Sequence, residues 1–87
     1  MFINGLAEAG AKLGLPEEKA LMMAANTVLG AAGMVNAGKG TPEALRIAVC
    51  SPGGATIEGV KVLQEEQFEE ITGKAVQAAY EKTLKLK

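Results

Sequence analysis

A run of apolar residues between Ala20 and Val35 constrains the fold of this chain more than any other segment. Only four residues interrupt the apolar side chains in it: Asn26, Thr27, Gly30 and Gly33. A helix here is apolar nearly all round and must be buried on most of its faces. It is shorter than the ~20 residues that a bilayer requires, and it carries a polar amide near its middle. We therefore expect a central helix of a soluble domain, with a transmembrane helix as the minor alternative.

Composition predicts an all-α fold. Hydrophobic residues make up 48% of the 87 residues and aromatic residues only 3%, so the core must use Ala, Val, Leu, Ile and Met, which are mostly good helix formers. A chain of this length forms one small domain, residues 1–87, and buries only about 60–65% of its extended surface. Small residues such as Ala24, Ala25 and Gly30 let a neighbouring helix come close. A homodimer is the favoured interpretation, with a tightly packed monomer as the alternative.

Helix signals predict about five helices and no strand. The expected segments are residues 1–13 with Gly14 at the C-terminal cap, a helix opening at Pro16, a short helix 42–49, one from about 55, and a last one from 68 to the lysine-rich end at 87. Thr41 is the expected N-cap of the short helix. The apolar spacing skips five residues across 64–67, which indicates a break, a kink or a rotated face.

The segment Gly33–Gly40 imitates a nucleotide-binding P-loop. It matches that pattern up to the last position, where Gly40 replaces Ser or Thr, although Thr41 follows. A true P-loop follows a strand and opens a helix, whereas here the first glycine lies inside a helix. We expect Gly38 to end that helix and Lys39 to lie near its negative end, with phosphate binding as the minor alternative.

The segment Cys50–Ile57 is the candidate site. Pro52 fixes its own φ, and the glycines at 53 and 54 permit a sharp turn. Apolar residues at helical spacing follow at once, so the free N–H groups of a new helix should belong to residues 54–57. Such a helix start can hold an anion. Cys50 has no base near it in sequence, and we interpret it as a small buried or half-buried thiol.

Charge and reactive residues exclude several classes of function. The formal net charge is −1, which argues against sequence-independent binding of nucleic acid or anionic lipid. The chain has no histidine and one cysteine, so a zinc site, a Cys/His nucleophile and an internal disulfide are not expected. No secretory leader opens the sequence, and we expect a cytoplasmic protein. Asn26 must find hydrogen-bond partners in the core or at a twofold interface.

Four sequence blocks resemble one known family. They are Leu13–Pro16, Ala25–Ala32, Thr41–Leu45 and Val49–Ile57. Their order and spacing are similar to the C-terminal domain of pyrroline-5-carboxylate reductase, which resembles the C-terminal domain of 6-phosphogluconate dehydrogenase-like proteins. The resemblance implies an interlocked twofold homodimer, possibly in a higher assembly. It also implies a part in proline biosynthesis, in which the enzyme reduces 1-pyrroline-5-carboxylate to L-proline with NADPH or NADH; the sequence does not distinguish the two cofactors.

The same resemblance assigns roles to matching residues. The Ser-Pro-Gly-Gly loop of the family binds the substrate carboxylate, which implies substrate-binding roles for Ser51, Gly53, Gly54 and the backbone of Ala55. The family's threonine at the start of the next helix hydrogen-bonds the ring nitrogen, which implies a catalytic role for Thr56. The free N–H groups and hydroxyls expected from the residues alone agree with these roles.

Departures from the family pattern carry expectations of their own. Ile47 stands where an acid is common, and Glu66-Gln67 stands where Gly-Gly is common, which leaves open whether the two last helices merge. No strand followed by a glycine fingerprint is present, so we expect a fragment without the dinucleotide-binding half. The missing half predicts a chain that binds no cofactor and is inactive alone, and the uncapped start at Met1 agrees with a fragment. The alternative is a free-standing helical homodimerisation module without a catalytic role.

Overall fold

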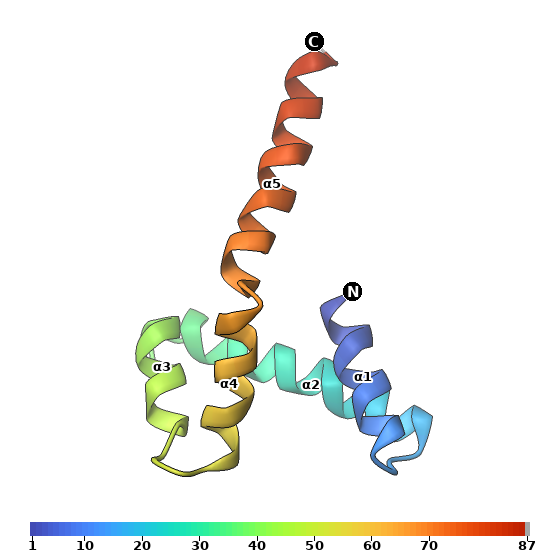
Figure 1. Ribbon diagram of the computed structural model, residues 1–87, viewed down its shortest axis with the longest axis vertical. Helices are drawn as coiled ribbons and strands as arrows, with labels where there is room; N and C mark the ends of the chain where they lie inside the picture. Colours follow the sequence, from blue (N-terminus) through green and yellow to red (C-terminus); the bar gives the residue numbers. More distant parts are fainter. Residues whose placement is uncertain (87) are drawn as a thin grey trace. The chain divides into compact units, whose positions relative to one another are not determined.

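The computed structural model describes residues 1–86, and these form five α-helices with no strand among them (Figure 1). The helices are α1 (Phe2–Lys12), α2 (Glu17–Asn36), α3 (Pro42–Val49), α4 (Ala55–Glu65) and α5 (Phe68–Lys85). The all-α fold and the five-helix order are therefore confirmed. The predicted end of the last helix at Lys87 lies outside the described residues. The chain divides into two compact units, one formed by residues 1–45 and one starting at residue 46, so that the boundary falls inside α3.

The first unit is built on the packing of α1 against α2. Its buried residues are all alanines: Ala7 from α1, and Ala20 and Ala24 from α2, with Ala11 partly buried against them. Methyl side chains let the two helix backbones approach closely. A Cβ added to Gly10 would lie 3.2 Å from Leu15 Cδ1, so the chain folds back tightly after α1.

The predicted helix ends are confirmed at both glycines. After α1, the Leu15 N–H donates to the Gly10 carbonyl at 3.1 Å, and Gly14 has a φ of 115°. After α2, the Lys39 N–H donates to the Met34 carbonyl at 3.0 Å, and Gly38 has a φ of 73°. Both are Schellman ends, in which a glycine adopts a left-handed conformation that costs other residues energy. The P-loop imitation is thus a helix end followed by a new helix.

The helix starts agree with the predictions to within one residue. Thr41 caps α3, because its Oγ1 accepts a hydrogen bond from the Ala44 N–H at 3.1 Å, and α3 begins at Pro42. Pro16 was predicted as the first helical residue of α2, but it is the N-cap, with φ −58° and ψ 139°, and the helix begins at Glu17. A shift of one residue at a helix end is small, because proline suits either side of the boundary.

Most of the apolar surface of α1 and α2 is exposed in the single chain, and burial of α2 against a second copy stays a prediction. In the first unit the buried residue of α1 is Ala7, which faces α2, whereas Leu13 is 89% exposed. In α2 only two alanines are buried, and the large side chains are exposed: Leu21, Met22, Met23, Leu29 and Met34. The reason is that α1 packs on the small residues, which allow the closest contact, and leaves the larger ones uncovered.

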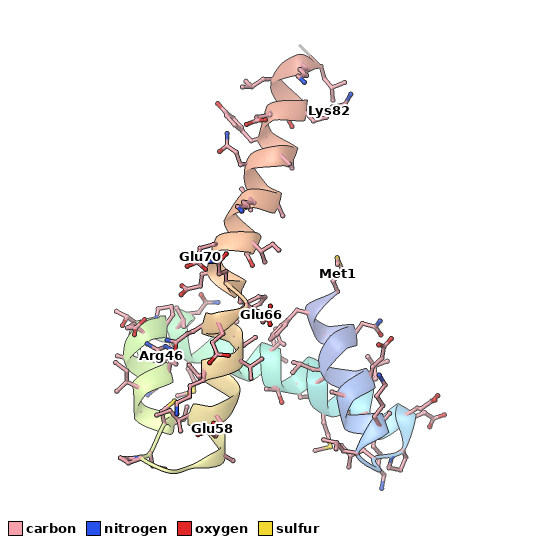
Figure 2. The ribbon with its side chains drawn as sticks, in the orientation of Figure 1. Met1, Arg46, Glu58, Glu66, Glu70 and Lys82 are labelled. Carbon is pink, nitrogen blue, oxygen red and sulfur yellow. The ribbon has the colours of Figure 1, made fainter. Side chains whose placement is uncertain are left out.

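α4 and α5 do not merge. Gln67 adopts a left-handed conformation, with φ 58° and ψ 50°, between the end of α4 and the start of α5. Figure 2 shows the helical ribbon interrupted near the labelled Glu66. The Gln67 N–H donates to the Gln64 carbonyl at 3.1 Å, and its own carbonyl accepts from the Ile71 N–H at 2.9 Å. The break predicted from the skipped spacing is confirmed. Within residues 1–86 no helix is both long and apolar enough to cross a membrane.

Candidate functional site

The segment between α3 and α4 forms a tight turn. The Gly54 N–H donates to the Ser51 carbonyl at 2.9 Å, which closes a four-residue turn with Pro52 second and Gly53 third. Gly53 has a φ of 73°, and proline followed by a residue of positive φ is the pattern of a type II turn. The sharp turn predicted from the sequence is confirmed.

The two glycines of the turn serve different purposes. Only Gly53 uses a positive φ, because Gly54 is extended, with φ −82° and ψ 163°. Gly54 is needed for space: a Cβ there would lie 2.7 Å from Ser51 Oγ and 3.1 Å from the Ser51 carbonyl oxygen. The Ser51 hydroxyl therefore lies directly against the backbone that leads into α4.

The turn leads directly into the N-terminal end of α4. Gly54 is the N-cap of α4 and makes no side-chain cap, so the N–H groups of Ala55, Thr56 and Ile57 have no intrahelical acceptor. These donors, together with the positive end of the helix dipole, favour an anion. Glu58, which is labelled in Figure 2, lies in the first turn of α4. It forms an exposed ion pair with Lys61 at 3.4 Å.

Two hydroxyls stand beside these donors. Ser51 and Thr56 are exposed, and neither hydroxyl makes a hydrogen bond with the described residues. Cys50, which precedes the turn, is a half-buried free thiol. A hydroxyl can both donate and accept, so this arrangement can hold a carboxylate on backbone N–H groups and contact a neighbouring polar atom.

The sequence-predicted site residues thus lie together. Ser51, Gly53, Gly54, Ala55 and Thr56 occupy one turn and the first turn of α4. Their binding roles stay predictions. Within residues 1–86 no group of three or more His, Cys, Asp or Glu side chains could hold a metal ion.

One hollow was not foreseen from the sequence. It has a volume of 310 Å³ and lies between α1 and α2, where its lining residues are Asn4, Ala7, Glu8, Ala11, Glu17 and Leu21. The Asn4 Nδ2 donates to Glu8 Oε1 at 3.1 Å across one turn of α1. The small alanines are the sequence feature that could have indicated this hollow, because their short side chains leave space beside the close contact between the two helices. The hollow is open, and its polar groups are exposed.

Comparison with known proteins relates residues 1–86 to one protein family. Residues 1–86 match the family model described as pyrroline-5-carboxylate reductase dimerisation. Pyrroline-5-carboxylate reductase of Escherichia coli is 43% identical over 86 residues, which are 99% of this chain and 32% of the relative. The Arabidopsis thaliana reductase is 44% identical over 84 residues, which are 97% of this chain and 30% of that protein.

A solved structure agrees with these relatives. The crystal structure of Plasmodium falciparum pyrroline carboxylate reductase with NADP bound is similar with a TM-score of 0.88 and 34% identity. The similarity covers 93% of this chain and 31% of that one. This chain therefore spans about a third of the length of the relatives it matches.

Proposed function

This chain belongs to the pyrroline-5-carboxylate reductase family as its dimerisation domain, and from that premise we propose that it supplies two parts of the enzyme. The first part is the interface between two copies of the chain. The second is the turn that binds the carboxylate of the substrate. In the proposed activity, 1-pyrroline-5-carboxylate is reduced to L-proline, and residues 1–87 act as one dimerisation and substrate-binding domain.

One observation carries the substrate assignment: the turn 51–54 ends in a helix whose first N–H groups have no acceptor. A carboxylate supplies the acceptors that Ala55 and the following N–H groups lack. Ser51 adds a hydroxyl donor, and Gly53 and Gly54 keep the backbone accessible. Thr56, in the first turn of α4, contacts the ring nitrogen beside the carboxylate and so orients the C=N bond for reduction.

The described residues do not fit a dinucleotide cofactor. A dinucleotide fold needs a strand followed by a glycine fingerprint, and residues 1–86 contain only helices and their connections. NADP is bound in the Plasmodium falciparum relative. We propose that NADPH or NADH is held outside residues 1–86 in the working enzyme, and that this chain alone does not catalyse the reduction.

The proposed partners are a second copy of the chain and the small substrate. A net charge of −1 argues against sequence-independent binding of nucleic acid or anionic lipid. The cytoplasm is the proposed compartment, because a reducing environment suits the free thiol of Cys50.

A chimera tests the substrate assignment. The matching third of the Escherichia coli relative is replaced by this chain, and NADPH oxidation is followed with 1-pyrroline-5-carboxylate. We expect activity, and we expect Thr56→Val to lower kcat/KM by about tenfold or more, because the ring nitrogen of the substrate loses its proposed hydroxyl partner.

Thr72→Val is the matched control. Thr72 Oγ1 donates only to the Phe68 carbonyl of its own helix, at 2.8 Å, so kcat/KM should stay within about twofold of the unmodified chimera. Equal kcat/KM values for Thr56→Val and the unmodified chimera would show that Thr56 has no role in binding or orienting the substrate. A folded, dimeric chimera without activity would favour the free-standing dimerisation module instead.

A further inference from the structure

The start of α4, proposed above to hold a carboxylate, has a carboxylate of its own close by. Between Cys50 and Val60 the sequence has a single charged residue, Glu58, and it lies in the first turn of α4 (Figure 2). Long side chains in a helix point back toward its N-terminus, over the residues three and four positions earlier. For Glu58 these residues are Ala55 and Gly54. A carboxylate in that position satisfies the same kind of free N–H group that attracts an external anion.

The Ala55 N–H is open to such a contact. It has no acceptor among the described residues, because Gly54, the N-cap, supplies no side-chain cap. Gly54 has no side chain and Ala55 has only a methyl group, so neither side chain shields the backbone. The Glu58 side chain is 69% exposed, and packing does not fix its carboxylate in one place. Glu58 and a bound anion therefore compete for one donor.

Lys61 directs the Glu58 carboxylate elsewhere. The Lys61 Nζ donates to Glu58 Oε1 at 3.4 Å, and Lys61 lies three residues further along α4. In this arrangement the carboxylate makes no hydrogen bond with the Ala55 N–H. The start of α4 thus stays open while the ion pair is formed.

We propose that Lys61 is a positioning residue, which keeps the start of α4 open for the substrate by holding the Glu58 carboxylate away from the Ala55 N–H. This inference rests on the proposed function and adds to it a control of access. Without Lys61, the Glu58 carboxylate caps the Ala55 N–H and competes with the substrate carboxylate. The substrate then binds only the fraction of molecules with open donors, so its apparent affinity falls by that fraction.

The two positions of the Glu58 carboxylate are close in free energy. An exposed ion pair stabilises a helix only slightly, and a carboxylate near a helix start gains a similarly small amount from the helix dipole. When two such small contributions oppose each other, removing one changes the populations several-fold. Loss of the Lys61 cation is therefore enough to shift Glu58 toward Ala55.

Nuclear magnetic resonance on this chain tests the contact without substrate. The amide proton of Ala55 is compared in the unmodified chain, in Lys61→Met, and in Lys61→Met combined with Glu58→Ala. We expect a downfield shift in Lys61→Met, because a carboxylate forms a short, strong hydrogen bond with a backbone N–H, and we expect Glu58→Ala to reverse it. An Ala55 resonance that does not move in Lys61→Met overturns the proposal. The new residues are good helix formers at exposed positions, so α4 should persist in each variant.

Kinetics of the chimera test the consequence for the substrate. Lys61→Met should raise KM for 1-pyrroline-5-carboxylate about threefold and leave kcat unchanged, because competition at the carboxylate weakens binding and not the chemical step. Glu58→Ala added to Lys61→Met should restore KM. Lys61→Arg is the matched control: it keeps a cation that can pair with Glu58, so KM should equal that of the unmodified chimera.

The outcomes separate this inference from the proposed function. An active chimera in which Lys61→Met leaves KM unchanged overturns the inference alone. A rise in KM that Glu58→Ala does not reverse also overturns it, since Lys61 would then act on the substrate directly. A folded chimera without activity overturns the proposed function, and the inference with it, whatever the Ala55 resonance shows.

Discussion

Gln67 is strained in a way that its neighbours are not. Within residues 1–86 it is the one non-glycine residue with a positive φ, and its conformation is left-handed. The left-handed conformation costs a residue with a Cβ roughly 1–2 kcal/mol of conformational free energy. The strain persists because the break lets Phe68 begin a new helix, in which Glu69 and Glu70 occupy the favourable first turn.

Replacing Gln67 with glycine should therefore stabilise the chain. Glycine adopts the left-handed region freely but loses more backbone entropy on folding, so Gln67→Gly should raise the free energy of unfolding by about 0.5–1 kcal/mol. Urea denaturation at one fixed protein concentration measures it. Gln64→Gly, inside α4, is the matched control and should lower stability by about 1 kcal/mol. A loss of stability in both variants would show that Gln67 is not strained.

At the scale of the element, the turn before α4 depends on one backbone angle. Gly53→Ala places a Cβ on a residue with a φ of 73°, which should lower the free energy of unfolding by about 1 kcal/mol. In the chimera it should also raise KM for the substrate, because the N–H groups at the start of α4 shift. The free energy of unfolding and KM are both measured on the Gly53→Ala chimera.

Gly59 provides the control for that substitution. It lies inside α4, and a Cβ there would meet no atom within 4 Å. Gly59→Ala should therefore raise the free energy of unfolding by about 0.5–1 kcal/mol and leave KM unchanged. If Gly53→Ala were as stable as Gly59→Ala, the positive φ would not be required for the turn.

The elements show which parts of the structure local sequence determines. The helix ends at Gly14 and Gly38 and the cap at Thr41 were predictable, because each depends on hydrogen bonds between residues close in sequence. The turn at 51–54 was predictable for the same reason. The left-handed Gln67 was not, because glutamine has no preference for that conformation, and only the skipped spacing indicated a break.

Burial could not be predicted in the same way. Apolar composition identified which segments need covering, but it did not tell which neighbour covers them, and the buried residue of α1 is the small Ala7 while Leu13 is exposed. The proposed substrate roles of Ser51 and Thr56 likewise depend on a molecule that local sequence does not specify. The positions of Ser51 and Thr56 at the turn were predictable from the sequence, whereas their proposed function rests on the family to which the chain belongs.

At the scale of the whole molecule, the described core is small for the amount of apolar surface. Its buried residues are three alanines, while large apolar side chains of α2, α4 and α5 are exposed, including Leu29, Val62, Ile71 and Tyr80. Exposed apolar surface of this extent requires a partner. The proposed partner is a second copy of the chain, in agreement with the dimerisation family to which the chain belongs.

The stability of the chain should therefore depend on its concentration. When unfolding is coupled to dissociation of a dimer, each tenfold rise in concentration adds about 1.4 kcal/mol of stability per dimer. With an unfolding entropy of about 2.1 cal/mol/K for each residue of two 87-residue chains, the Tm should rise by about 4 °C per tenfold increase. Circular dichroism from about 2 to 200 μM should show a shift of about 8 °C. A Tm that stays constant over this range would mean that the folded chain is a monomer, because only an associating species gains stability from its own concentration.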